Sequence, residues 1–246
     1  MKQNGKRVAV VVGASSGIGA ATARALAGSG MDVALAARRG DLLEGVRGSL
    51  PEGAASIVVP TDITDRSAVG ELVRRTEQEL GPPDVLVNCA GVMYYTLMAN
   101  LRQDDWERTV SVGCNGLLNA VGAVLPGMLS RGRGHIVTVS SDAGRKAFPG
   151  LAVYSGVKAF AEFVSQGLRL ETAGTGLKVT TVQPGNTQTD LLSMSRDAEA
   201  EKLYGAPTGA RILDPEDVAR AILYAVSQPD HVAVNEILVE PREEPV

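Results

Sequence analysis

The stretch Val8-Ala9-Val10-Val11-Val12-Gly13-Ala14-Ser15-Ser16-Gly17-Ile18-Gly19 precedes an alanine-rich segment that ends at Ala27. Its apolar run predicts a buried parallel strand, and the alanine-rich segment predicts a helix. A strand, a glycine turn and a helix in this order are typical of a nucleotide site, because the free N–H groups and the positive end of the helix hold phosphate. Gly13 permits the tight turn, while Gly17 and Gly19 allow close approach of backbone to phosphate and of helix to strand. The alternative is a helix start that binds no ligand.

Strands and helices alternate along the rest of the chain. Further strands are predicted at 32–37, 57–60, 85–88, 135–140, 178–183 and 236–240. Helices are predicted at 18–29, 41–50, 66–80, 101–131 with a joint near Gly113, 152–172, 191–204 and 215–227. This alternation predicts an α/β fold in which a seven-stranded parallel sheet lies between two layers of helices, a Rossmann-type αβα sandwich. No linker or repeat divides the sequence, so residues 1–246 are expected to form a single domain, dinucleotide-binding in its N-terminal half and catalytic in its C-terminal half, with a frayed tail at 241–246.

A tyrosine and a lysine lie four residues apart in the predicted helix 152–172, as Tyr154 and Lys158. That spacing puts both side chains on one helix face. A phenol loses its proton near pH 10, and a nearby fixed positive charge lowers this pKa, so the pair is suited to exchange a proton with a substrate oxygen. Ser141 follows the strand 135–140, and its hydroxyl is the candidate hydrogen-bond donor to the same oxygen. Alone the pair is weak evidence for a catalytic site, because a buried ring and a solvated charge at this spacing are common on helices.

Five ordered motifs together resemble those of the short-chain dehydrogenases/reductases. They are the glycine turn 13–19, Asn88-Cys89-Ala90-Gly91, Ser141, the Tyr154 and Lys158 pair, and Pro184-Gly185 followed by Thr189. The resemblance covers essentially the whole chain. It implies hydride transfer between a nicotinamide cofactor and an alcohol or carbonyl. In that family pattern Tyr154 is the general acid or base, Lys158 lowers its pKa and holds the nicotinamide ribose, and Ser141 polarises the carbonyl.

The end of the second predicted strand bears on the choice of cofactor. NAD-binding folds usually place an Asp or Glu there to bind the ribose 2′-hydroxyl, but the residues here are Ala37-Arg38-Arg39. Arginine binds a 2′-phosphate through fork-shaped, charge-assisted hydrogen bonds. The sequence therefore favours NADP(H), with Arg38 as the main contact and Ser15, Ser16 or Arg39 assisting. Two arginines that cap a surface loop are the alternative.

The resemblance implies further cofactor contacts after three other strands. Asp62, with Ile63 beside it, matches the position that contacts adenine, although a turn aspartate is nearly as good an interpretation. Asn88, Ala90 and Gly91 match the cofactor groove, where Cys89 replaces an asparagine. The segment from Pro184 matches the one that holds the nicotinamide carboxamide. The candidate cofactor contacts are Gly13, Ser15, Ser16, Gly17, Ile18, Gly19, Arg38, Arg39, Asp62, Ile63, Asn88, Ala90, Gly91, Tyr154, Lys158, Pro184, Gly185, Thr187 and Thr189.

One position departs from the family pattern. The family spacings from Asn88 and back from Ser141 place its fourth catalytic residue, an asparagine, at Gly113. In the family this residue kinks the helix, and its backbone carbonyl holds a water in a relay to the lysine. Glycine keeps the carbonyl but loses the side chain, at about 1 kcal/mol of helix stability. Activity is expected to survive; a cofactor-binding homologue with weak or no catalysis is one alternative, and a dehydratase or epimerase is another.

The sequence does not select the substrate. Met93, Tyr94, Tyr95, Phe148 and Leu151 flank the motifs and are candidate substrate contacts, with core or interface packing as an equal alternative. The segment 191–204 lies where the family has a mobile lid. The run 231–241 loosely resembles a branch that includes clavulanate-type aldehyde and 3-hydroxy acid dehydrogenases. The expected substrate is a small-molecule carbonyl compound or alcohol.

Composition and charge limit the other classes of function. The formal net charge of −4 is spread over interspersed acids and bases, so no nucleic-acid partner is expected. Cys89 and Cys114 form no metal-ligand pattern, so neither a metal site nor a disulfide is expected, and a cytoplasmic location is favoured. Neither a signal peptide nor an apolar run of bilayer-spanning length is expected, and hence no membrane partner. The resemblance implies a homo-oligomer, a dimer or tetramer packed through helices 101–131 and 152–172.

Two smaller expectations concern local structure. Asp41 opens the second predicted helix and is interpreted as its N-cap. His135 opens a strand after Arg131-Gly132-Arg133-Gly134 and is expected to be exposed.

Overall fold

The computed structural model describes residues 5–205 and 209–244, and its centre is a seven-stranded parallel sheet. The strand order is β3-β2-β1-β4-β5-β6-β7, so the predicted parallel sheet of seven strands is confirmed. The strands are β1 (Val8–Val12), β2 (Asp32–Ala37), β3 (Ser56–Pro60), β4 (Val85–Asn88), β5 (Gly134–Val139), β6 (Leu177–Pro184) and β7 (Glu236–Val239).

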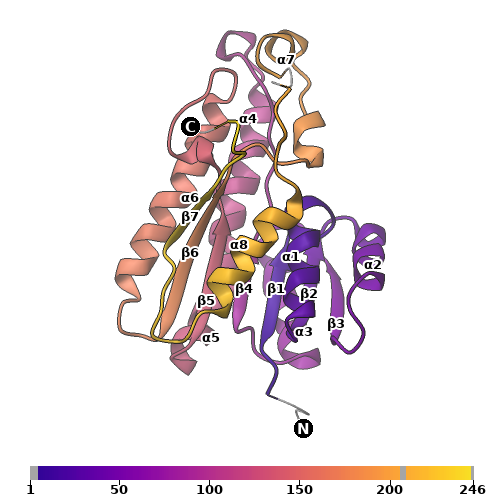
Figure 1. The fold of residues 1–246 in the computed structure, drawn as a ribbon, viewed down its shortest axis with the longest axis vertical. Helices are drawn as coiled ribbons and strands as arrows, with labels where there is room; N and C mark the ends of the chain where they lie inside the picture. The colour runs from indigo at the N-terminus through magenta and orange to yellow at the C-terminus, as the bar shows by residue number, and fades with distance from the viewer. Residues whose placement is uncertain (1–4, 206–208, 245–246) are drawn as a thin grey trace.

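Helices cover both faces of the sheet, as Figure 1 shows. Successive side chains of a strand point to opposite faces, so Val11 joins the core under one helical layer and Val10 the core under the other. The first layer contains α1 (Gly17–Gly28), α2 (Gly40–Gly48) and α8 (Pro215–Ser227). The second contains α3 (Arg66–Glu79), α5 (Gly116–Arg131) and α6 (Ala152–Glu171). The result is the three-layer αβα arrangement expected from the alternation of elements.

The strand order reverses beside β1, which pairs with β2 on one side and β4 on the other. In open parallel sheets a crevice forms at the carboxyl ends of the strands where the order reverses, and ligands bind there. The glycine turn follows β1 and the segment from Cys89 follows β4. The fold therefore brings two of the sequence motifs to the same edge of the sheet.

The predicted joint near Gly113 is a π-helical turn, Ser111–Asn115, between α4 (Gln103–Val110) and α5. Such turns occur as single insertions in α-helices and are frequent at functional sites. The continuous helix Gln103–Arg131 has an 18-residue window of mean hydropathy 1.4, so its length and composition alone would allow it to span a membrane. The expectation that no apolar run reaches that length is therefore wrong. One face of the helix packs in the core of the second layer, while Leu118 and Leu129 are exposed.

Three local expectations are wrong. Helix α2 begins at Gly40 after the N-cap Arg39, so Asp41 lies in the first helical turn, where a carboxylate stabilises the helix dipole. His135 is 1% exposed because β5 runs between β4 and β6, and its Nε2 lies 2.7 Å from Thr180 Oγ1. Burial lowers the pKa of His135 from its ordinary 6.5 to about 3, with Lys178 and Arg7 as further causes.

The segment 191–204, predicted as one helix, is broken into a 3₁₀ turn, η4 (Asp190–Ser193), and α7 (Ala198–Tyr204).

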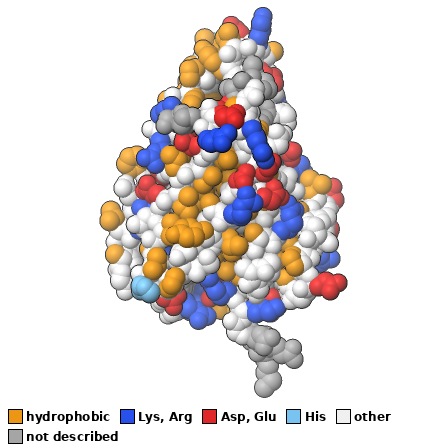
Figure 2. All heavy atoms as spheres, viewed as in Figure 1, with side chains coloured by type: hydrophobic (Ala, Val, Ile, Leu, Met, Phe, Trp, Pro, Cys, Tyr) orange, Lys and Arg blue, Asp and Glu red, His pale blue; other side chains and the backbone are white. Residues whose placement is uncertain are grey.

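Acidic and basic side chains alternate over the face seen in Figure 2. No large block of one sign appears on that face, as the interspersed charges of the sequence predict.

Candidate functional site

A cleft of about 1440 Å³ runs along the carboxyl edge of the sheet. The loops that follow β1 to β6 all contribute to its walls. Every candidate cofactor contact lines it except Asn88, which lines a small adjoining cavity. Of the five candidate substrate contacts, Met93, Tyr95, Phe148 and Leu151 line the cleft and Tyr94 does not.

Tyr94 lies outside the cleft wall, which favours the alternative of core packing for this residue. Its ring packs against the core between the sheet and α5, whereas Met93 and Tyr95 face the cleft. Side chains alternate in direction along an extended segment, so the middle residue of the three points the opposite way. Three apolar residues in a row do not reveal from the sequence which of them faces the cleft.

The glycine turn is packed so tightly that two of its glycines cannot carry a side chain. Gly13 has φ +82°, and a Cβ there would lie 2.8 Å from Ala90 N. A Cβ on Gly19 would lie 2.1 Å from the carbonyl oxygen of Gly13. Gly17 differs, because with φ +51° its missing Cβ faces Thr189 Cγ2 at 3.1 Å across the cleft. A side chain at Gly17 would fill the gap in front of the start of α1, so the turn fits a pyrophosphate held by backbone N–H groups.

The two arginines after β2 occupy different places. Arg39 Nη2 donates to Ser15 Oγ at 3.2 Å and to Ser16 Oγ at 3.4 Å, so this guanidinium lies over the glycine turn. Arg38 lines the same cleft, and its charge acts on Asp62. Both side chains are exposed and available to a phosphate at the mouth of the cleft. Arg39, rather than Arg38, is the arginine that forms hydrogen bonds with the serines of the glycine turn.

Asp62 is held by its own turn and by a third arginine. Its Oδ1 accepts from Thr64 N at 2.9 Å and Thr64 Oγ1 at 2.8 Å, while Oδ2 lies 3.9 Å from Arg108 Nη2. Partial burial raises the pKa of Asp62, but the Thr64 hydrogen bonds and the charges of Arg108 and Arg38 outweigh it, and the pKa is lowered. The interpretation as a turn aspartate therefore holds alongside the one as a cofactor contact. Arg108 lines the cleft and was missed, because one arginine in an amphipathic helix carries no distinctive signal.

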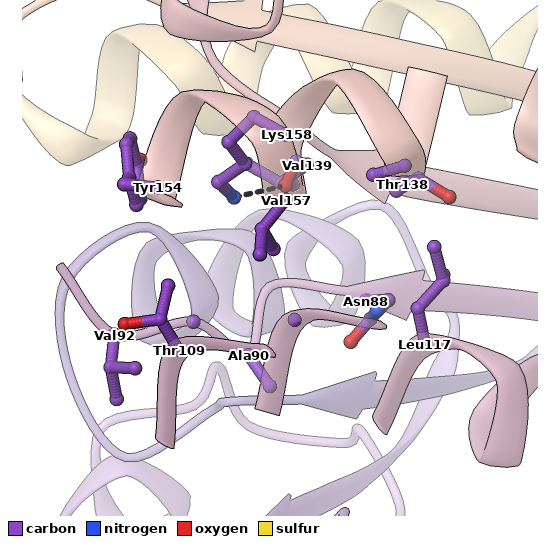
Figure 3. A pocket seen from close by; sticks show the side chains of 13 residues that line it. Asn88, Ala90, Val92, Thr109, Leu117, Thr138, Val139, Tyr154, Val157 and Lys158 are labelled. Carbon is purple, nitrogen blue, oxygen red and sulfur yellow. Dashed lines mark hydrogen bonds between the residues drawn. The ribbon is translucent and has the colours of Figure 1, made fainter. Parts of the chain in front are cut away.

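Tyr154 and Lys158 lie on one face of α6, as their spacing predicts (Figure 3). The Lys158 ammonium lies 5.5 Å from the centre of the Tyr154 ring and donates to the carbonyl oxygen of Val139 at 3.0 Å. Burial lowers the pKa of Lys158 to about 8, against the opposing effects of Cys89 and Glu162. The lysine is thus anchored to the end of β5 and keeps its charge near neutral pH.

The pKa of Tyr154 moves in the opposite direction to the expectation. Burial raises it to about 12, with Asp142 and Tyr95 raising it further and a hydrogen bond with Ser141 lowering it. The ring is 8% exposed, so loss of the proton would place an anion in an apolar pocket. Desolvation of the phenolate, which depends on the folded pocket, is the largest influence on this pKa. At neutral pH the phenol is therefore a proton donor.

Ser141 lies two residues beyond the end of β5, with its side chain in the cleft and 7% exposed. Its Oγ donates to Asp142 Oδ1 at 2.7 Å and accepts from Ala143 N at 3.1 Å. Ser140 turns away and donates to the carbonyl oxygen of Lys158 at 3.2 Å, as strand alternation predicts. The carboxylate of Asp142 beside the serine was missed, although its adjacency in sequence was visible.

The π turn brings the backbone of Gly113 beside Lys158. A cavity of about 10 Å³ lies between them and is also lined by Asn88, Thr138 and Tyr154 (Figure 3). That volume corresponds to the room that one water molecule needs. Asn88 Oδ1 is buried without a hydrogen-bond partner among the described residues, so the cavity wall includes an acceptor suited to water.

The side chain that Gly113 lacks is replaced by an apolar group from α6. A Cβ on Gly113 would lie 2.2 Å from Val157 Cγ1, and Val157 is 6% exposed. The methyl group therefore occupies the space in which an asparagine side chain would begin. This glycine and this valine are complementary in shape.

Residues 7–200 match the model of a protein family described as short chain dehydrogenase. The chain belongs to the short-chain dehydrogenase family. Glycine betaine reductase ATRR of Emericella nidulans is 62% identical over 241 residues, which are 98% of this chain and 19% of that protein. The chain thus spans about a fifth of the length of this relative.

Other members of the family match over their whole length. An uncharacterized oxidoreductase of Staphylococcus aureus strain MW2 is 37% identical over 235 residues, covering 96% of this chain and 97% of that one. The closed form of a serine dehydrogenase complexed with NADP+ superposes with a TM-score of 0.88 and 30% identity, covering 97% of this chain and 96% of that one. Sequence and structure agree on the family and on the Rossmann-type fold.

Proposed function

We propose that this short-chain dehydrogenase is an NADP(H)-dependent oxidoreductase that reduces a small aldehyde or ketone. The observation that carries the proposal is a single cleft in which Ser141, Tyr154 and Lys158 converge at the carboxyl end of β5, while the glycine turn and Arg39 lie along its other half. The NADP+ complex of the similar serine dehydrogenase supports the choice of cofactor. The arginines after β2, with no carboxylate at Ala37, support it independently.

Ser141, Tyr154 and Lys158 each have a separate role in the proposed carbonyl reduction. A bound nicotinamide supplies the hydride, which adds to the carbonyl carbon and leaves negative charge on the oxygen. The Ser141 hydroxyl, which has a single proton, turns from Asp142 Oδ1 to donate a hydrogen bond to that oxygen, and Tyr154 transfers its proton to it, which gives the alcohol. Lys158 stabilises the phenolate that remains until solvent returns a proton. The raised pKa of Tyr154 keeps this proton in place for the reductive direction.

The substrate class is proposed from the relative at 62% identity, whose name specifies glycine betaine. A carboxylate is a poor hydride acceptor, and the site described above is suited to a carbonyl. We therefore assign to this chain the reduction of an aldehyde that carries a trimethylammonium group, such as trimethylammonioacetaldehyde. Oxidation of a hydroxy acid is the second candidate, because a serine dehydrogenase is among the similar structures.

The first experiment follows oxidation of NADPH and NADH with aldehydes and reduction of NADP+ and NAD+ with hydroxy acids, with Tyr154→Phe as the matched control. Phenylalanine keeps the buried ring and removes only the proton donor. We expect NADPH oxidation that falls at least a hundredfold in the variant, the usual contribution of a general acid. Tight NADPH binding without turnover of any substrate would instead support the catalytically idle homologue.

The pH dependence follows from Lys158. Its pKa of about 8 means that the ammonium is present below that pH and lost above it. Since kcat/KM reports ionisations of the free enzyme, kcat/KM for NADPH should be level below about pH 8 and fall above it. A profile that stays level to pH 10 would contradict a role for the lysine charge.

We also propose a homo-oligomer packed through α5 and α6. Phe163 and Leu170 on α6 are 73% and 75% exposed, and Leu118 on α5 is 47% exposed. Large apolar side chains in such number on neighbouring helices are typical of an interface. Light scattering during size-exclusion chromatography would test it, and a monomer at micromolar concentration would exclude it.

A further inference from the structure

Arginines gather at one end of the cleft and carboxylates at the other, apart from Asp62 among the arginines and Lys158 beside Tyr154. Arg38, Arg39 and Arg108 lie on the side of β2 and β3, whereas Asp142 and Asp190 follow β5 and β6. Three strand spacings separate β2 from β5, roughly 14 Å at about 4.8 Å each. Since the screening length at physiological salt is about 8 Å, the three arginines act only weakly on a group bound beside Asp142.

The Asp142 carboxylate lies close enough to the reacting position for its charge to act on a bound substrate. Its Oδ1 accepts from Ser141 Oγ at 2.7 Å and from Ala143 N at 2.7 Å, so the carboxylate is fixed beside the serine that faces the reacting oxygen. Its charge reaches the neighbouring phenols: after burial, Asp142 is the next cause that raises the pKa of Tyr95, and it also contributes to that of Tyr154. An anionic substrate would be repelled at this place and a cationic one attracted.

Aromatic rings stand on the same side of the cleft. A Cβ on Gly150 would lie 3.3 Å from Tyr95 Cδ1 and 2.9 Å from Tyr204 Cδ2, so the two rings meet across this glycine. Tyr95 and Phe148 also pack with Met93 and Leu151 around Tyr154. Faces of aromatic rings attract quaternary ammonium groups, and cages of such rings are a common way to bind them.

Hydrogen bonds hold this aromatic wall in place. Tyr95 N donates to Ser195 Oγ at 2.8 Å, which ties its loop to the segment before α7. Asp197, 5% exposed, accepts from Leu97 N at 3.0 Å and from Asn100 Nδ2 at 3.0 Å, and it also caps α7, which carries Tyr204. The wall is therefore built before any substrate arrives.

We propose that Asp142, together with the rings of Tyr95 and Tyr204, binds the ammonium group of a cationic carbonyl substrate and selects it over neutral and anionic ones. The assignment rests on the reductase function proposed above and gives it a recognition site. Three basic side chains lie nearby and oppose it, and one is Lys158, whose ammonium lies 5.5 Å from the centre of the Tyr154 ring. Arg145 is bonded to Gln183 Oε1 at 3.1 Å, and the exposed Lys146 places its ammonium 5.2 Å from the centre of the Phe148 ring.

The test compares two aldehydes of the same shape. Trimethylammonioacetaldehyde carries a quaternary nitrogen where 3,3-dimethylbutanal carries a quaternary carbon, so the ratio of their kcat/KM values isolates the contribution of charge. We expect the wild-type protein to favour the cation and Asp142→Asn to reduce the ratio about tenfold, since asparagine keeps the acceptor oxygen beside Ser141 and Ala143. Because only the ratio is used, any effect of the variant on Ser141 itself cancels.

Two further variants keep the test decisive should Asp142→Asn fold poorly. Tyr204→Leu keeps an apolar side chain and should reduce the ratio two- to fivefold, whereas Lys146→Gln removes an opposing charge and should raise it. An unchanged ratio in all three variants, with both aldehydes consumed, would overturn the recognition site and leave the reductase standing. Failure to consume either aldehyde, with NADPH bound, would overturn the reductase proposal itself.

Discussion

Two glycines in opposite helical layers, Gly19 and Gly113, have equally little space for a side chain, yet different atoms occupy that space. A Cβ on Gly19 would lie 2.1 Å from a backbone oxygen, that of Gly13, and a Cβ on Gly113 would lie 2.2 Å from a side-chain methyl, that of Val157. The backbone of the glycine turn is fixed by hydrogen bonds to β2, such as Gly13 N to the carbonyl oxygen of Ala36 at 2.8 Å. A valine side chain can be exchanged without moving the main chain. The first glycine is therefore a requirement of the fold, and the second is one of two complementary choices.

The largest loss in the free energy of unfolding is expected for Gly19→Ala. The new methyl group must displace the turn that joins β1 to α1, because nothing movable lies between them. Overpacking against fixed backbone should cost about 3 kcal/mol or more in the free energy of unfolding. Urea denaturation would measure it, and a variant within 1 kcal/mol of the wild type would show that the turn is more yielding than its contacts indicate.

The contrast also explains which parts of the structure the sequence predicts. The glycine turn is local, because its strand, glycines and helix lie within 20 residues, so spacing alone locates it. Val157 lies 44 positions from Gly113, and no pattern in either segment announces that the two touch. The same limit applies to His135, whose burial depends on its neighbours β4 and β6, and to Tyr154, whose pKa depends on the surrounding pocket. Asp142 was visible in the sequence, but its place in the cleft near Tyr95 and Tyr154 depends on the fold.

The second largest loss of stability is expected for Gly113→Asn, which restores the asparagine of the family pattern. Valine has one strongly preferred rotamer in a helix, so Val157 cannot simply turn aside, and the variant should lose about 1–3 kcal/mol in the free energy of unfolding. Val157→Ala removes the opposing methyl group. In the double variant the loss should be smaller than the sum of the two single losses, which a double-mutant cycle by urea denaturation measures.

Strict additivity of Gly113→Asn and Val157→Ala would contradict the complementarity of the pair. Activity gives a second readout. If the family asparagine improves the proton relay, then kcat should rise in the double variant relative to Val157→Ala alone.

Gly17→Ala is expected to lose less stability than the two variants above, and its main effect should be weaker binding of NADPH. At φ +51° an alanine is strained by about 1–2 kcal/mol, and its methyl group meets only Thr189 Cγ2, at 3.1 Å. The fold should therefore persist while the methyl group narrows the gap in front of α1. The dissociation constant of NADPH, measured by fluorescence, should rise at least tenfold with little change in the melting temperature. Equal affinity in the variant would move the phosphate site away from this turn.

The smallest effect is expected for Gly70→Ala, and its sign is opposite. Gly70 lies within α3, is exposed, and has nothing within 4 Å of its missing Cβ. Alanine at such a position lowers the entropy of the unfolded chain and favours the helix, so stability should rise by about 0.5–1 kcal/mol with cofactor affinity unchanged. Because Gly70, Gly113 and Gly19 all lie in helical segments, the three variants differ mainly in what the new methyl group meets. A loss of stability in Gly70→Ala would mean that helical glycines in this chain are required for a reason other than space, and the comparison of Gly19 with Gly113 would lose its basis.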